Sequence, residues 1–151
     1  KAYPKAEILA VELSDKAFSY LKENLKRNAC ENIKAIKGDI FRLYEEFSAS
    51  EFDAVLSNPP YIKTDIIATL AKEVQHEPRL ALDGGKDGMI FYNSIIENWK
   101  GKVKRNGFIG VEIGEDLTNE IVELFKENNF EDVYVLKDMA GLDRAVFGTV
   151  H

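Results

Sequence analysis

The sequence has very few cysteine and histidine residues, and this scarcity excludes several kinds of site. Cys30 is the one cysteine among 151 residues, so no disulfide can form within the chain. Its neighbours Ala29 and Glu31 give no reason to expect a reactive thiol, which favours a structural role. The two histidines, His76 and His151, are far apart, and with a single cysteine they form no metal-ligand spacing. We therefore expect no bound metal ion.

Long apolar runs and an excess of basic residues are also missing. No stretch approaches the roughly 20 apolar residues that span a bilayer, and residues 1–5 lack the apolar core of a signal peptide. The lone cysteine fits a reducing compartment, so we expect a cytoplasmic protein with no membrane partner. The net charge is −6, so no overall field attracts nucleic acid, and we expect no direct nucleic-acid partner.

Short apolar runs alternate with amphipathic stretches along the whole chain. With 151 residues and 45% hydrophobic content, this pattern predicts one domain, 1–151, with a single core. Strand–helix alternation is typical of a doubly wound α/β sheet. The connection 137–144 is too short for a crossover helix, so the last two strands should form an antiparallel hairpin. We expect strands at 8–11, 33–36, 52–57, 108–113, 133–136 and 145–150, and helical segments at 14–28, 41–47, 87–100 and around 117–125.

The residues Ser57-Asn58-Pro59-Pro60-Tyr61 directly follow an apolar strand-like run. Two consecutive prolines cannot continue a strand ladder or start a helix at once, because neither donates a backbone hydrogen bond. The result should be a stiff loop at the carboxyl end of a strand, where open α/β sheets bind ligands. Its amide side chain, bare carbonyls and aromatic ring favour a pocket for a planar group that carries an NH2. The alternative is a proline pair that only interrupts regular structure, and the flanking Asn58 and Tyr61 disfavour it.

Two acidic residues end the first two predicted strands. A carboxylate at the place of Glu12 can accept hydrogen bonds from both hydroxyls of a ribose. Asp39, which follows Gly38, can accept the amino group of an adenine. The alternatives are a solvated carboxylate for Glu12 and, for Asp39, the N-cap of a helix that starts at Ile40. Both acids and the Asn58 loop lie at the ends of predicted strands, and this shared position favours a nucleotide-type ligand.

The segment 62–86 has little periodicity, and loops of that length inside a compact domain are usually functional. Its end is rich in glycine, with Gly84, Gly85 and, shortly after, Gly88. These glycines predict a tight turn before the next helix. A phosphate cradle is the weaker interpretation, because the neighbouring carboxylates of Asp83 and Asp87 would repel an anion.

Three stretches resemble known methyltransferase motifs. Asn-Pro-Pro-Tyr at 58–61 resembles the catalytic motif of the S-adenosylmethionine-dependent methyltransferases that modify exocyclic or amide nitrogens. The sequence EVQHEPRLALDGGKDG at 73–88 resembles the signature of the HemK-type peptide chain release factor glutamine methyltransferases. The tail at 137–144 is similar to the closing hairpin of the same family. The resemblance covers essentially all 151 residues.

The resemblance implies a Rossmann-like methyltransferase sheet, S-adenosyl-L-methionine as cofactor, and N5-methylation of a glutamine side chain in release factors. It implies that Asn58, Pro59 and Tyr61 are catalytic. The Asn58 side-chain oxygen and the Pro59 carbonyl would bind the two hydrogens of the acceptor amide, and Tyr61 would pack on its plane. Glu12, Asp39 and Asn58 would bind the cofactor, and no metal is needed.

Parts of that family's pattern do not occur in the sequence. The first glycine is Gly38, so the glycine-rich cofactor loop and the first strand of the sheet should lie upstream of Lys1, as should a helical domain. We expect the missing strand to belong between 8–11 and 52–57, and the chain alone to be a poor methyltransferase. Two alternatives stay open: a nucleic-acid amino-group methyltransferase, which the acidic balance disfavours, and a noncatalytic fragment of the fold.

Overall fold

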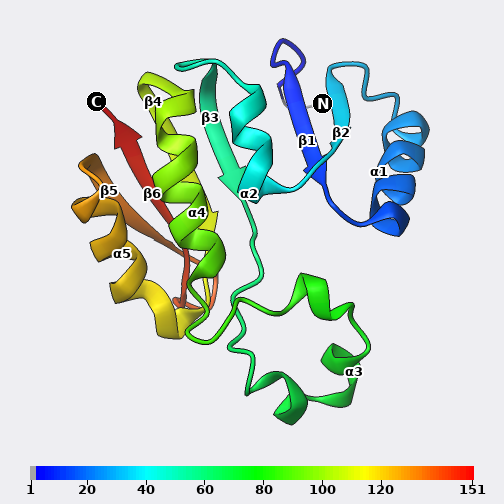
Figure 1. Cartoon of the computed structure of the whole chain (residues 1–151), viewed down its shortest axis with the longest axis vertical. Coiled ribbons are helices and arrows are strands. Elements are labelled where there is room, and N and C mark those ends of the chain that lie inside the picture. The colour runs from blue at the N-terminus through cyan, green and yellow to red at the C-terminus, as the bar shows by residue number, and fades with distance from the viewer. Residues whose placement is uncertain (1–2) are drawn as a thin grey trace. The chain divides into compact units, whose positions relative to one another are not determined.

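The computed structural model describes residues 3–151, apart from the side chain of Glu115, and divides into two compact units between Glu46 and Phe47. Figure 1 shows the elements in chain order. Each unit has a sheet of its own. The expectation of one catalytic domain over residues 1–151 stays a prediction.

The first unit is a two-stranded parallel sheet with one long helix. The helix begins at Asp15 because the Ser14 hydroxyl accepts the N–H of Ala17 at 3.3 Å and so caps its amino end. It ends at Arg27, before the C-cap Asn28. The expected strands and helix are confirmed. The elements are β1 (Ile8–Glu12), α1 (Asp15–Arg27), β2 (Ile33–Lys37), α2 (Ile40–Leu43) and the 3₁₀ helix η1 (Tyr44–Glu46).

The second unit is built on a four-stranded mixed sheet. Its strands are β3 (Phe52–Ser57), β4 (Val103–Glu112), β5 (Phe130–Lys137) and β6 (Asp143–Val150). Their order is β3-β4-β6-β5, with β3 parallel to β4 and β6 antiparallel to both β4 and β5. The antiparallel hairpin expected at the end of the chain is therefore confirmed. The helices are α3 (Lys72–Gln75), α4 (Ile90–Trp99) and α5 (Thr118–Glu127), with the 3₁₀ helices η2 (Ile67–Thr69), η3 (Arg79–Ala81), η4 (Lys100–Lys102) and η5 (Glu115–Leu117).

The core of the second unit lies between its sheet and the helices α4 and α5, which cover the same face of that sheet in Figure 1. The inner face of α4 consists of Tyr92, Ile95, Ile96 and Trp99, which are all buried. Phe125 of α5 is 0% exposed and packs edge-on against Phe130, with ring centres 4.8 Å apart. A membrane-crossing helix, which needs about 20 apolar residues, does not occur within residues 3–151.

The opposite face of this sheet carries exposed apolar side chains. The pairing places Leu56, Gly110, Phe147 and Tyr134 in one row across the four strands. Leu56 is 67% exposed and Tyr134 is 51% exposed. The rings of Tyr134 and Phe147 are stacked, with centres 5.3 Å apart and an angle of 8° between their planes. Within this row, the Tyr134 and Phe147 rings therefore pack on each other.

Several element boundaries differ from the sequence-based expectation, and β5, for example, begins at Phe130 rather than at 133. β4 begins at Val103 rather than at 108, because an irregular register with β3 admits the charged residues 104–105 into the strand. α4 begins at Ile90 rather than at 87. The reason is Gly88, whose φ of +82° lies outside the helical region.

Each sheet has an edge without a partner strand. Within residues 3–151, β1 pairs only with β2, and β3 pairs only with β4. Direct pairing of β1 with β3 would have contradicted the expectation of an intervening strand, and that pairing is not observed in the described part of the chain. The intervening strand itself stays a prediction.

Candidate active site

The loop after β3 places an exposed amide beside a buried proline. β3 ends at Ser57, and the side chain of Asn58 is exposed, whereas Pro59 is buried and Tyr61 is half-buried. The Pro59 ring locks its own φ, and the following Pro60 restricts the ψ of Pro59, so the direction of the Pro59 carbonyl is restricted. The loop thus holds an amide, a carbonyl and an aromatic ring at the carboxyl end of the strand, where the sequence predicts them.

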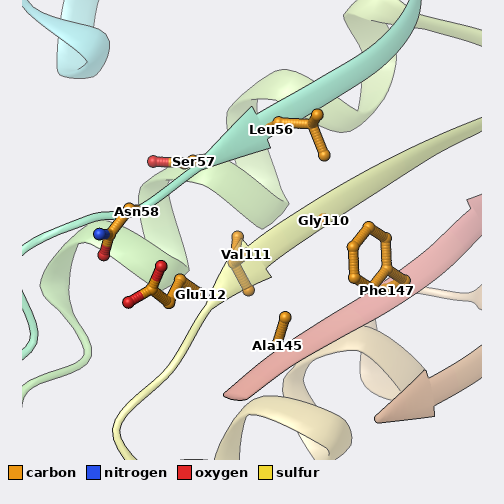
Figure 2. Close-up of a pocket in the computed structure, with 8 residues that line it drawn as sticks. All are labelled: Leu56, Ser57, Asn58, Gly110, Val111, Glu112, Ala145 and Phe147. Atoms are coloured by element: carbon orange, nitrogen blue, oxygen red, sulfur yellow. The ribbon is translucent and has the colours of Figure 1, made fainter. Parts of the chain in front are cut away.

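An open pocket of about 240 Å³ lies on the sheet beside this loop. Figure 2 shows Asn58 and Glu112 together at the ends of β3 and β4, with Leu56 farther back on β3 and Phe147 on the neighbouring strand β6. Gly110 lies between them, and a Cβ there would come 2.4 Å from the Phe147 ring. The pocket therefore depends on the missing side chain at this position.

Glu112 is a pocket residue that the sequence analysis missed. The buried Tyr92 hydroxyl donates to the backbone carbonyl of Glu112 at 2.9 Å and so fixes the end of β4. Burial raises the pKa of Tyr92, and the nearby Tyr61, Glu112 and Asp116 add to the effect, so the hydroxyl keeps the proton that it donates. The signal that could have found Glu112 is the one used for Glu12, an acidic residue at the end of an apolar strand.

Glycines allow other parts of the chain to lie directly against Pro60 and Tyr61. A Cβ on Gly84 would come 2.6 Å from the Tyr61 Cα and 2.9 Å from the Pro60 carbonyl oxygen. A Cβ on Gly88 would come 2.5 Å from the Tyr61 carbonyl oxygen, and one on Gly114 would come 3.0 Å from the Tyr61 ring. A loop packed this closely on its backbone and on its ring has little room to move.

Asp83 ties the glycine-rich turn to the segment that follows the proline pair. Its carboxylate accepts the Thr64 hydroxyl at 2.6 Å, the Gly85 N–H at 3.0 Å and the Arg79 Nε–H at 3.0 Å. The Thr64 hydroxyl, the Gly85 N–H and Arg79 together hold the pKa of Asp83 below its usual range. The expected tight turn is confirmed, and these hydrogen bonds fasten it.

The turn between β5 and β6 is organised in the same way around Asp138. Oδ1 of Asp138 accepts the N–H groups of Ala140 and Leu142, and Oδ2 accepts Nη2 of Arg144 at 3.0 Å. Arg144 and the Leu142 N–H hold the pKa of Asp138 below its usual range. In turn, the hydrogen bond to Asp138 raises the pKa of Arg144.

The first unit holds the two predicted cofactor carboxylates. Glu12 ends β1, and Asp39 follows β2, which runs parallel to it. Oε1 of Glu12 accepts the N–H of Ser14 at 2.7 Å, and Oδ1 of Asp39 accepts the N–H of Phe41 at 3.0 Å. Asp39 is therefore the N-cap of α2. Each of these bonds occupies one of about four acceptor positions of a carboxylate. The remaining capacity fits the hydroxyl and amino donors of a nucleoside.

The structure brings Asn58, Pro59 and Tyr61 together in the second unit, and Glu12 and Asp39 together in the first. Their catalytic and cofactor-binding roles stay predictions. No group of three or more His, Cys, Asp and Glu side chains in residues 3–151 is placed to hold a metal ion.

Comparison with protein families gives one match over most of the chain. The family model described as "Conserved hypothetical protein 95" matches residues 5–110. The chain belongs to this family. The matched region of the chain runs from before β1 into β4. It contains Glu12, Asp39 and the loop 58–61.

Curated relatives carry the name release factor glutamine methyltransferase. The relative from Thermodesulfovibrio yellowstonii is 36% identical over 147 residues, which are 97% of this chain and 52% of the relative. The relative from Clostridium botulinum is 40% identical over 143 residues, which are 93% of this chain and 50% of the relative. The chain therefore spans about half the length of these curated relatives. The resemblance expected from the sequence is confirmed.

The fold is similar to that of solved methyltransferases. A crystal structure of a methyltransferase from Pyrococcus furiosus superimposes with a TM-score of 0.68 at 22% identity, covering 95% of this chain and 62% of that chain. At this identity the likeness shows the fold alone. It confirms the expected Rossmann-like α/β architecture with an antiparallel terminal hairpin.

Proposed function

We propose that the protein transfers a methyl group from S-adenosyl-L-methionine to the side-chain N5 nitrogen of a glutamine in a peptide chain release factor. The observation that carries this proposal is the loop after β3, where the exposed Asn58 amide stands beside a fixed carbonyl at the edge of an open pocket. The name release factor glutamine methyltransferase, carried by relatives at 36% and 40% identity, supports the same substrate.

Asn58 and Pro59 can solve the main chemical difficulty of this reaction. An amide nitrogen is a poor nucleophile because its lone pair is delocalised into the carbonyl. The Asn58 side-chain oxygen and the Pro59 carbonyl can accept its two hydrogens, which fixes the direction of the nitrogen. The same acceptors stabilise positive charge that develops on the nitrogen as it reacts. Tyr61 packs on the plane of the amide and limits its rotation.

Glu12 and Asp39 supply the acceptors that a nucleoside needs, as their geometry in the first unit allows. Glu12 would hold the ribose hydroxyls, Asp39 the adenine amino group, and Asn58 would face the reactive end of the cofactor. When bound, S-adenosylmethionine supplies a strongly electrophilic methyl group. The chain's own contribution is therefore binding and orientation.

A protein substrate suits the charge of the chain better than a nucleic acid does. The net charge of −6 repels a phosphate backbone at long range. Release factors act in translation termination, so we place the protein in the cytoplasm.

The test is transfer of a labelled methyl group from S-adenosylmethionine to a release factor, with RNA and DNA compared under the same conditions. It should use the protein as it occurs in the cell, including any residues that precede Lys1. We expect label on one glutamine of the release factor, located by mass spectrometry. Label in RNA or DNA and none in the release factor would overturn the proposal.

The variant Asn58→Ala tests the residue that carries the proposal. We expect the rate of transfer to fall about 100-fold or more, because one transition-state hydrogen bond is lost, while cofactor affinity stays nearly unchanged. The matched control is Asn119→Ala, which removes another exposed amide, from α5. Near-normal turnover of Asn58→Ala would remove this residue from its assigned role.

A further inference from the structure

The segment 82–88 runs beside the residues that follow the proline pair. The Ile62 N–H donates to the Leu82 carbonyl at 2.9 Å, and the Gly84 N–H donates to the Ile62 carbonyl at 2.8 Å. These bonds form an isolated parallel bridge between Ile62 and Asp83. The end of the loop after β3 and the glycine-rich turn are therefore joined through their backbones.

Gly84 and Gly88 are buried at this contact. A methyl group at either position would meet backbone atoms of Pro60 or Tyr61 at 2.5–2.9 Å. Non-bonded heavy atoms normally stay about 3.5 Å apart, so the backbone of Pro60 and Tyr61 would be displaced by about 1 Å. Backbone atoms cannot rotate out of the way as the end of a flexible side chain can.

We infer that Gly84 and Gly88 are positioning residues for methyl transfer, an inference that rests on the proposed function. By admitting the turn into direct contact with the backbone of Pro60 and Tyr61, they set where the preceding Pro59 carbonyl and the Tyr61 ring stand. They act through those two groups and not by touching the acceptor amide. The absence of a side chain at both positions is then a requirement of the reaction as well as of the turn.

Each test variant has a matched control elsewhere in the chain. Gly101→Ala controls for the added methyl group, because nothing lies within 4 Å of a Cβ at that position. Gly141→Ala controls for backbone strain, because its φ of +83° is close to the +82° of Gly88 and its surroundings are open. A milder variant, Thr64→Val, removes the 2.6 Å hydrogen bond to Asp83 without adding an atom at the contact.

We expect Gly84→Ala and Gly88→Ala to lower kcat about 100-fold, the effect of a misplacement of about 1 Å in a reacting site. Gly101→Ala and Gly141→Ala should stay within about threefold of the wild type, because surface changes of this kind have small effects. Thr64→Val should lower kcat about fivefold, through loss of one hydrogen bond. Cofactor affinity, measured by calorimetry, should be unchanged in every variant, whereas general damage to the fold would lower it together with kcat.

Glycine variants that keep the kcat of their controls would overturn the inference. An equal loss in Gly141→Ala would also overturn it, because the effect would then belong to backbone strain alone. If Gly84→Ala and Gly88→Ala do not fold, Thr64→Val decides the matter, and an unchanged kcat in that variant rejects the positioning role.

A second measurement does not depend on methyl transfer. Amide hydrogen exchange at Ile62 should speed up in Gly84→Ala and not in Gly101→Ala, with Val111 in β4 as the internal reference. If the wild type methylates no release factor, the proposed function fails, and this measurement still decides whether the turn fixes the loop. Equal protection of Ile62 in both variants would overturn the positioning claim.

Discussion

Replacing Tyr92 by phenylalanine removes a single hydroxyl from the core of the second unit. Tyr92 is 0% exposed, and its hydroxyl donates to the Glu112 carbonyl at 2.9 Å. A hydrogen bond of this kind contributes about 1 kcal/mol, and an acceptor left without its partner in the interior costs about 1–3 kcal/mol. Because the ring packing is kept, we expect Tyr92→Phe to lower the free energy of unfolding by about 1–2 kcal/mol and the melting temperature by about 2–8 °C.

The pH dependence of this loss is a more demanding test. Burial raises the pKa of Tyr92 above its ordinary value of 10.0. The folded protein therefore binds this proton more tightly than the unfolded chain does. The resulting stability is fully present below about pH 10 and is lost as the pH rises toward the folded-state pKa. The stability difference between the wild type and Tyr92→Phe should accordingly shrink above about pH 10.

Urea unfolding followed by circular dichroism at about pH 8 and about pH 11 would measure both effects. The matched control is Tyr134→Phe, since that residue is 51% exposed and its ring would keep its stacking on Phe147. We expect the control to change stability by no more than about 0.5 kcal/mol. A Tyr92→Phe protein as stable as the wild type at the lower pH would refute the hydrogen-bond reasoning. A difference that does not change with pH would refute the burial reasoning.

The remaining predictions concern the first-unit carboxylate and the terminal turn. Glu12→Ala should weaken cofactor binding by about 2–3 kcal/mol, more than it alters the transfer step; calorimetry that finds unchanged affinity would place the ribose elsewhere. Arg144 holds the pKa of Asp138 below its ordinary 3.8, so the stability from this pair is present above that pH and is lost as the pH falls below it. Asp138→Asn should remove this loss of stability at low pH. If the stability of the variant falls between about pH 5 and about pH 3 with the same slope as that of the wild type, the prediction is wrong.

Local patterns in the sequence predict most of the elements, because the forces behind them act over a few residues. Ser14 is recognisable as an N-cap because its hydroxyl has only to reach the N–H of Ala17. The pair Pro59-Pro60 marks the end of β3, because neither residue can donate to a ladder. The β5–β6 hairpin follows from the shortness of its connection.

The contacts that hold the candidate site join residues far apart in the chain, and the sequence does not predict them. Gly84 has the pattern of an ordinary turn glycine, and its contact with the Tyr61 backbone depends on the path of the intervening loop. The start of β4 is hidden for a related reason. Lys104 interrupts the apolar pattern, yet it belongs to the strand, where its Nζ donates to Asp53 of β3 at 2.8 Å. Only the folded register reveals that pair.

The parallel pairing of β3 with β4 also has a consequence for the order of folding. The β5–β6 hairpin forms after closure of the short turn 138–142, whereas β3 meets β4 only when residues 58–102 have been looped out. Longer loops lose more entropy on closure, and non-local pairing slows folding. We therefore expect β3 to join the sheet late and to be the strand of this unit that opens most readily. Such an opening would separate Asn58 from Glu112 while the hairpin stays folded, so the candidate site would be lost before the rest of the sheet opens.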